Sequence, residues 1–178
     1  MRYFDTSFLV PLILPEATSE PISGFFEVLP ADDLAVSQWT RVEFASLLSR
    51  EIRMGSLDAG TAREAGSQFE SMIGESFVVL LPNRDDFDRA KEWLGNFETG
   101  LRAGDALHLA IAGNRNAEAI YSLDKLMLAA GKTLGLPASA GTPLRAMMIN
   151  GTHTRVAVRG TLVVAESTAW SSFECPSS

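Results

Sequence analysis

The stretch FVVLLP, residues 77–82, is an uninterrupted apolar run in which Val78 and Val79 are β-branched. An apolar run without polar alternation predicts a strand that is covered on both faces, and such strands belong to parallel sheets. β-Branched residues also favour the extended backbone of a strand. The stretch therefore predicts one strand of a parallel sheet that carries helices on both faces.

Strand and helix patterns alternate on either side of this stretch. Further strands are expected at residues 2–5, 34–37 and 119–122. Helices are expected at residues 8–14, from Thr18 or Ser19 to Leu29, and at 40–53, 61–73, 83–94, 105–112 and 124 to 131 or 135. This alternation predicts an α/β domain with a mostly parallel central sheet and helices on both faces.

The alternation ends near residue 136, which predicts two regions in the chain. Residues 1–136 form the predicted domain, and residues 137–178 are expected to be a linker and a C-terminal extension. Residues 137–143, PASAGTP, have the composition of a linker. Residues 154–165 alternate weakly between apolar and polar, which would suit a hairpin or an added edge strand.

The composition is that of an ordinary globular chain, with 178 residues of which 46% are hydrophobic and 21% charged. One domain is the default for this length. No window of about 18 apolar residues lacks charge, and the N-terminus resembles no signal peptide, so a cytoplasmic protein without a membrane segment is expected. The single cysteine, Cys175, excludes an internal disulfide framework and a zinc cluster built from cysteines.

The formal net charge of −7 is concentrated in the predicted domain. The first 142 residues hold 12 basic and 20 acidic side chains, whereas the last 36 residues hold 3 and 2. This balance excludes a protein that coats nucleic acid nonspecifically, because such a protein needs a broad basic face. It is compatible with an enzyme whose own carboxylates bind metal ions.

Four acidic residues are expected near the carboxyl ends of the strands, where ligands bind in α/β sheets. They are the strand-ending Asp5, Glu43 near the start of a helix, Asp105 at the opening of a helix, and Asp124 after the strand at 119–122. Clustered carboxylates repel one another unless a cation binds among them. Oxygen ligands of this kind suit Mg²⁺ or Mn²⁺.

Each of these carboxylates also has a purely structural interpretation. Asp105 and Asp124 stand where a helix-capping residue belongs. Glu43 lies within an apolar stripe and therefore needs a polar partner. Asp5 is harder to explain in this way, because it is bounded by Phe4 and Phe8 at the end of a buried strand. The structural interpretation accounts for the residues singly, but not for the set.

Four segments resemble the signature regions of the PIN-domain ribonucleases, in particular the VapC-type toxins of type II toxin-antitoxin systems. The segments are RYFDTSFLVPLIL, VEFASLLSREIRMG, LRAGDALHLAIA and YSLDKLMLAAGKTLGL, and together they span residues 2–136. The resemblance implies that the catalytic and metal-binding carboxylates are Asp5, Glu43, Asp105 and Asp124. It also implies supporting hydroxyl groups at Thr6, Ser7 and Ser122.

The resemblance further implies a divalent-metal-dependent endoribonuclease that hydrolyses structured RNA such as tRNA or rRNA. Hydrolysis of this kind leaves 5′-phosphate and 3′-hydroxyl ends. The implied partners are an RNA substrate, a second copy of the chain in a homodimer, and a small antitoxin that inserts an arginine among the carboxylates. Local cations would hold the RNA, and the candidates are Arg41, Arg102, Arg115 and Lys125.

Other functions are weaker. A PIN-like module that binds RNA or protein without cutting is the main alternative, but it has no reason to keep four mutually repelling carboxylates. The residues Gly131-Lys132-Thr133 resemble the end of a phosphate-binding loop, which requires glycine where the chain has Leu126. A dehalogenase-type phosphatase would need an acidic residue at Ser7.

His108 lies three residues after Asp105, on the same predicted helical face. This spacing would suit a metal ligand or a general base. The apolar neighbours Leu107 and Leu109 favour a packed histidine instead.

Overall fold

Five parallel strands form a single sheet in the computed structural model, which describes residues 1–30 and 33–141. The spatial order is β3-β2-β1-β4-β5, so the first strand of the chain lies at the centre. Every neighbouring pair is parallel. The strands are β1 (Arg2–Phe4), β2 (Leu34–Ser37), β3 (Val78–Leu80), β4 (Ala119–Tyr121) and β5 (Ala138–Ser139).

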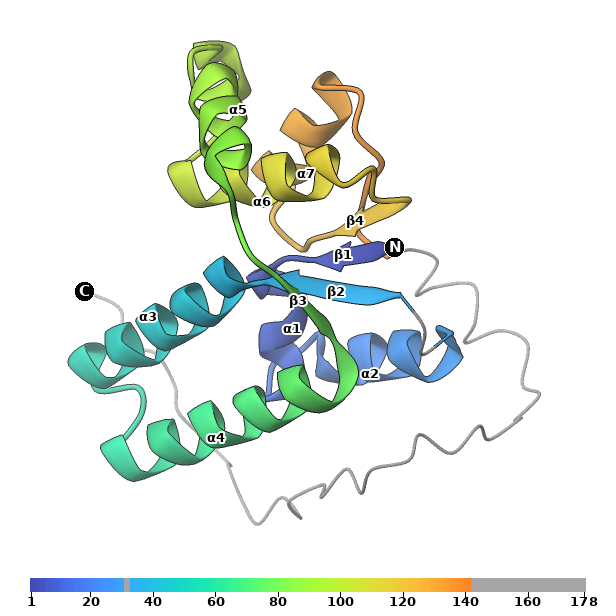
Figure 1. Ribbon diagram of the computed structural model, residues 1–178. Helices are drawn as coiled ribbons and strands as arrows, with labels where there is room; N and C mark the ends of the chain where they lie inside the picture. The colour runs from blue at the N-terminus through green and yellow to red at the C-terminus, as the bar shows by residue number, and fades with distance from the viewer. Residues whose placement is uncertain (31–32, 142–178) are drawn as a thin grey trace.

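Helices cover both faces of this sheet (Figure 1). The helices α5 (Arg84–Leu94), α6 (Ala103–Asn114) and α7 (Lys125–Thr133) lie on one face, and α1 (Thr6–Leu9), α2 (Ser19–Val28), α3 (Gln38–Met54) and α4 (Ala59–Ser76) lie on the other. Two short 3-10 helices, η1 (Val10–Leu12) and η2 (Phe97–Thr99), complete the described part. The expected α/β fold with a parallel sheet is confirmed.

Two hydrophobic cores form because successive residues of a strand face opposite sides of the sheet. Tyr3 and Ile120 pack against α6 and α7, whereas Phe4 and Tyr121 face α1 and α2. The second core is rich in aromatic rings, and these include Phe4, Phe8, Phe25, Phe26, Phe77 and Tyr121. Phe4 and Phe8 are fully buried, and each contributes about 1.5–3 kcal/mol by leaving water.

Helix α3 has a capping box at its start and a glycine at its end. Ser37 accepts a hydrogen bond from the Thr40 backbone N–H, and the Thr40 hydroxyl accepts one from the Ser37 N–H in return. Gly55 ends the helix with φ of +75°, in the left-handed region where glycine carries no steric penalty. These caps fix where α3 begins, immediately after β2, and so place Glu43 near the end of the sheet.

The structure differs from the sequence-based expectations at the two edges of the sheet. β3 is an edge strand, and Val78 and Leu81 are 59% and 69% exposed, so the expectation that this stretch is covered on both faces is wrong. The segment expected to be a linker contributes β5, which pairs with β4. The possible strand at residues 154–165 lies outside the described residues. Four helices begin two residues earlier than expected: α1 at Thr6, α3 at Gln38, α4 at Ala59 and α6 at Ala103.

The described helices include none that is both long enough and apolar enough to cross a membrane.

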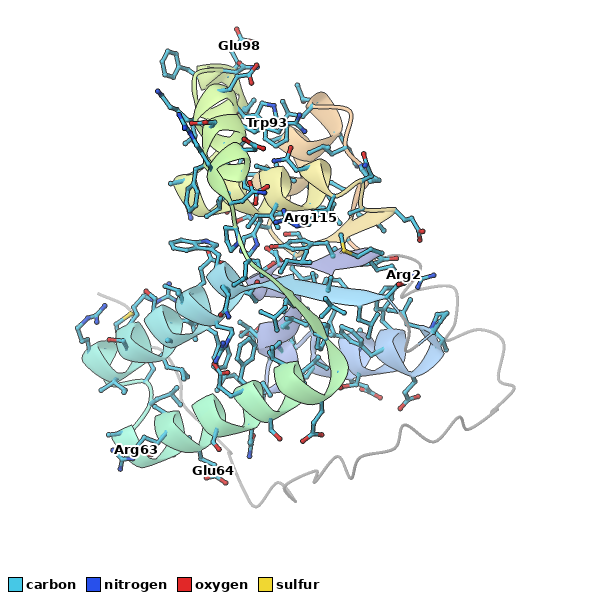
Figure 2. All side chains as sticks on the ribbon, in the orientation of Figure 1. Arg2, Arg63, Glu64, Trp93, Glu98 and Arg115 are labelled. Atoms are coloured by element: carbon cyan, nitrogen blue, oxygen red, sulfur yellow. The ribbon has the colours of Figure 1, made fainter. Side chains whose placement is uncertain are left out.

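A buried carboxylate joins α5 to α6. Asp86 is fully buried, and it accepts hydrogen bonds from the Asn83 backbone, from Asn114 and from Arg115. The same guanidinium group donates to the backbone oxygens of Ile111 and Leu81. Figure 2 shows Arg115 between the α5–α6 layer and the sheet. This cluster therefore fixes two helices and the end of β3 together.

Replacing Asp86 with asparagine should lower the free energy of unfolding by about 3 kcal/mol, because Arg115 then loses its charged partner in a buried setting. Asp88→Asn on the same helix is the matched control. Asp88 is exposed, and its one ion pair within residues 1–30 and 33–141 is with Arg84, one turn away, so its loss should cost less than about 1 kcal/mol. Equal losses in chemical denaturation of the two variants would contradict this role for Asp86.

The contribution of Asp86 should also depend on pH. Burial pushes the pKa of Asp86 upward, but hydrogen bonds from Asn83, Asn114 and Arg115 outweigh it and hold the pKa below its ordinary value. A lowered folded-state pKa stabilises the protein above the unfolded-state pKa of about 3.9, and this stabilisation disappears as the pH falls through the folded-state value. The stability difference between wild type and Asp86→Asn should therefore stay constant from about pH 7 to pH 5 and narrow below about pH 4. A difference that narrowed between pH 7 and pH 5 would show that another group controls it.

Candidate active site

Asp5 stands directly after the central strand β1 and is 5% exposed. Its Oδ1 atom accepts hydrogen bonds from the Phe8 backbone N–H at 3.1 Å and from the Ser7 hydroxyl at 2.8 Å. Its Oδ2 atom accepts one from the Ser122 hydroxyl at 3.0 Å. The carboxylate therefore caps α1 and is fixed by hydroxyl groups from two neighbouring strand ends.

The environment of Asp5 disfavours its charge. Burial raises the pKa of Asp5 to about 6, against the opposing effects of His108 and of the hydrogen bonds from Ser7, Ser122 and Phe8. No lysine or arginine in the described ranges forms a salt bridge with Asp5. A buried carboxylate of this kind gains stability from a nearby cation.

Ser122 connects Asp5 to Asp124. The backbone N–H of Asp124 donates to the Ser122 hydroxyl at 3.0 Å, while the Leu123 N–H donates to Ser7 at 2.8 Å. Asp124 in turn caps α7, as expected, by accepting hydrogen bonds at Oδ1 from the first backbone N–H groups of the helix. The turn after β4 is thus fixed against the turn after β1.

Asp105 faces the same region from α6. Asp105 is the third residue of α6 and not its N-cap, which is Arg102, so the expectation that Asp105 opens this helix is wrong. Its Oδ2 atom still accepts a hydrogen bond from the Arg102 backbone N–H. Burial raises the pKa of Asp105, and the charges of Asp124 and Glu43 raise it further, while His108 opposes them. Asp105 therefore lies within electrostatic range of both Asp124 and Glu43.

Glu43 has the polar partners that its apolar surroundings require. Thr6 donates to Oε2 at 2.5 Å, and Nε2 of His108 lies 2.6 Å from the same atom. Although burial pushes the pKa of Glu43 upward, these contacts lower it below its ordinary value. Thr6 therefore supports Glu43, whereas Ser7 and Ser122 support Asp5.

His108 is packed, as the sequence favours, since it is 1% exposed. Packing is only part of its role, because its Nδ1 atom lies 2.7 Å from the Tyr3 hydroxyl while Nε2 meets Glu43. The sequence gives no sign of the Tyr3 contact, which depends on β1 and α6 meeting in space. The spacing of three residues between Asp105 and His108 indicates only that His108 lies near the candidate site.

The arrangement suits a divalent cation by the chemistry of its donors. The four carboxylates offer only oxygen ligands. Burial raises the pKa of Asp5, and burial together with the charges of Asp124 and Glu43 raises that of Asp105, so a bound cation would relieve the unfavourable charge. Within residues 1–30 and 33–141, however, no group of three or more His, Cys, Asp or Glu side chains is arranged closely enough to hold a metal ion. The carboxylates thus face one region without forming a closed ligand shell.

The candidate RNA-binding cations fall into two groups. Arg41 pairs with Glu70, with 2.6 Å between Nη2 and Oε2, and Arg115 belongs to the Asp86 cluster, which leaves it unavailable for RNA. Arg102 and Lys125 are exposed and lie at the starts of α6 and α7, next to Asp105 and Asp124.

A family model for the PIN domain matches residues 2–132 of the chain. No curated protein sequence matches it significantly. Three solved structures with the same fold are as follows. VapC20 of Mycobacterium tuberculosis, described as a toxin that cleaves the sarcin-ricin loop, has 22% identity and a TM-score of 0.60 over 74% of this chain and 95% of that one. FitAcB from Neisseria gonorrhoeae has 15% identity and a TM-score of 0.62 over 79% and 98%. A toxin-antitoxin complex from Klebsiella pneumoniae has 18% identity and a TM-score of 0.53 over 80% and 98%.

Ser122→Ala should lower the free energy of unfolding by about 1–3 kcal/mol, because it leaves the Asp124 N–H without its hydrogen-bond partner and removes one of the two hydroxyl groups that donate to the buried Oδ2 atom of Asp5. Ser71→Ala is the control, since the Ser71 hydroxyl donates a hydrogen bond to the exposed Glu75 on the same helix, α4. Thermal and chemical unfolding of both variants measures the difference. A Ser122→Ala protein as stable as wild type would mean that the hydroxyl does not hold the two turns together.

Proposed function

We propose, because this chain belongs to the PIN-domain family, that it is a divalent-metal-dependent endoribonuclease that cleaves structured RNA and acts as the toxin of a toxin-antitoxin pair. PIN domains are typically metal-dependent nucleases. The observation that carries the proposal is the buried Asp5 carboxylate, which hydroxyl groups orient and no described cation neutralises. A structural role alone does not explain a charge placed in this way.

Asp5, Asp105 and Asp124 would hold Mg²⁺ or Mn²⁺. When bound, such an ion supplies positive charge that neutralises the scissile phosphate and makes water a better nucleophile. Ser7 and Ser122 orient the Asp5 carboxylate, and Glu43 either completes the oxygen shell or accepts a hydrogen bond from the attacking water. Hydrolysis in line breaks the bond between phosphorus and the 3′ oxygen, and it leaves a 5′-phosphate and a 3′-hydroxyl.

The proposed substrate is a looped RNA of the tRNA or rRNA class. Arg102 and Lys125 would contact phosphates beside the carboxylates, because both are exposed next to Asp105 and Asp124. Arg41 could join them by exchanging Glu70 for a phosphate. The described activity of VapC20 on the sarcin-ricin loop supports this class of substrate. Such RNA is found in the cytoplasm, which is the proposed site of action.

The proposed protein partners are a second copy of the chain and a small antitoxin. A structural relative from Klebsiella pneumoniae was solved as a toxin-antitoxin complex, which supports an antitoxin here. An arginine of the antitoxin placed among Asp5, Asp105 and Asp124 would supply the positive charge that these carboxylates lack. Inhibition would follow from occupation of the cation site.

A PIN-like module that binds RNA or protein without cutting is the second candidate. The open arrangement of the carboxylates in the described residues favours it over the nuclease. The presence of four acidic residues in one region favours the nuclease, because their charges repel one another unless a cation binds among them. Cleavage that depends on the carboxylates separates the two.

Asp5→Asn and Asp105→Asn should abolish metal-dependent cleavage without lowering the stability of the metal-free protein, because each removes a carboxylate whose charge the folded state disfavours. The assay incubates protein free of antitoxin with total bacterial RNA in EDTA, Mg²⁺ or Mn²⁺ and maps both ends of each fragment. Asp88→Asn, an exposed change on α5, is the control and should cut as wild type does. Unfolded Asp5→Asn and Asp105→Asn proteins would favour a structural role for both residues, and cleavage in EDTA would exclude the proposed mechanism.

A further inference from the structure

A buried chain of hydrogen bonds runs from β1 through α6 to the candidate site. The Tyr3 hydroxyl lies 2.7 Å from Nδ1 of His108, and Nε2 of His108 lies 2.6 Å from Oε2 of Glu43. Tyr3 is fully buried and His108 is 1% exposed. The chain therefore connects a carboxylate of the site to the centre of the sheet.

The direction of the hydrogen bonds follows from the groups at the two ends. Burial raises the pKa of Tyr3, so its hydroxyl keeps its proton, although the nearby hydroxyl groups of Ser37 and Thr40 oppose this rise. The Tyr3 hydroxyl therefore donates to Nδ1 of His108. Because the Glu43 carboxylate only accepts, the imidazole proton stands on Nε2 and points at Glu43.

Gly104 borders the same carboxylate from α6. A Cβ atom at this position would lie 2.5 Å from Oε1 of Glu43 and 3.3 Å from Nε1 of Trp39. Trp39 Nε1 is buried and has no hydrogen-bond partner among the described residues, yet it lies close enough to favour the charged form of Glu43. Oε1 of Glu43 thus occupies space that only glycine leaves open.

We propose that His108, oriented by Tyr3, and Gly104 are positioning residues that together fix the Glu43 carboxylate for the reaction. The inference rests on the proposed nuclease function and extends it to residues outside the four carboxylates. His108 and Thr6 hold Oε2, and Gly104 leaves room for Oε1. The conformation of the Glu43 side chain in the structure satisfies both conditions.

The sequence allowed two interpretations of His108, a metal ligand or general base on the one hand and a packed histidine on the other. The positioning role agrees with the packed histidine. Both ring nitrogens already have partners, and the side chain is almost fully buried. It therefore acts through Glu43 and contacts neither substrate nor metal ion. Residues that orient a ligand in this way typically change metal affinity or activity by about 10- to 100-fold when they are removed.

Gly104→Ala is the sharpest test, because it removes no polar group. The atom that must move lies at the end of the flexible Glu43 side chain, and alanine favours the helix more than glycine does. The variant should remain folded and lose about 10- to 100-fold in kcat, with weaker binding of Mn²⁺ alone. Tyr3→Phe should lower kcat in the same way. Gly74→Ala on α4, where nothing lies within 4 Å of the new Cβ, is the matched control and should behave as wild type.

Nitrogen-15 spectra of the histidine rings provide a readout that does not depend on activity. The chain has two histidines, so the signals of His108 are identified by their loss in His108→Gln. Wild type should show the proton of His108 on Nε2, and Tyr3→Phe should shift this signal. A proton on Nδ1 in wild type would overturn the proposed direction of the chain.

The outcomes separate this inference from the function on which it rests. A wild-type protein that cuts no RNA would overturn the proposed function together with the role of these residues in it. An active wild type whose Gly104→Ala and Tyr3→Phe variants keep full kcat and Mn²⁺ affinity would overturn the positioning role alone.

Discussion

All strands of the described sheet point in one direction, and this constraint determines where the polar residues gather. In a parallel sheet the carboxyl ends of the strands share one edge, so side chains that follow β1 and β4 become neighbours although they are far apart in sequence. Asp5 and Asp124 reach the same region in this way, and Ser122 joins them. Helices α3 and α6 then add Glu43 and Asp105 from opposite faces of the sheet.

Placing carboxylates in this region is unfavourable because they lose water and repel one another, and hydrogen bonds from neighbouring groups compensate part of this free energy. Each charged group receives hydrogen bonds from hydroxyl or backbone N–H groups, which are neutral, and Glu43 also has the imidazole of His108. Neutral donors stabilise a carboxylate without cancelling its charge. The four carboxylates therefore keep an uncompensated negative charge. A cation bound among them would compensate this charge, which is why the fold supports the proposed binding of a cation. The cluster around Asp86 differs from the candidate site in this respect. There the guanidinium group of Arg115 neutralises the carboxylate, and the ion pair serves only to hold α5 and α6 together.

Local patterns in the sequence were sufficient for most of the fold. The stretch FVVLLP correctly predicted a parallel strand, but it lies at the edge of the sheet, where Val78 is exposed to solvent in this chain. An apolar run predicts that a strand forms, but it does not predict whether another strand will pair with its outer edge. β5 was missed because two residues are too few to produce a pattern. The order of the strands depends on packing across the whole sheet.

The candidate carboxylates could be selected from the sequence, because Asp5 follows a strand, Asp105 and Asp124 lie at helix starts, and Glu43 interrupts an apolar stripe. Their partners could not be. The contacts of His108 with Tyr3 and Glu43 join residues 105 and 65 positions apart, and the cluster around Asp86 joins α5 to the end of α6. Such contacts arise only when elements meet in space. Gly104 had no visible role until the position of the Glu43 oxygen was known.

The central claim is that Asp5, Asp105 and Asp124 bind a divalent cation at the carboxyl edge of the sheet. The most direct test is a crystal structure of the full chain with Mn²⁺, located by its anomalous scattering. We predict a Mn²⁺ peak within coordination distance of these three carboxylates, with Glu43 still bonded to His108. An anomalous map without a peak there, from crystals grown at saturating Mn²⁺, would contradict the claim.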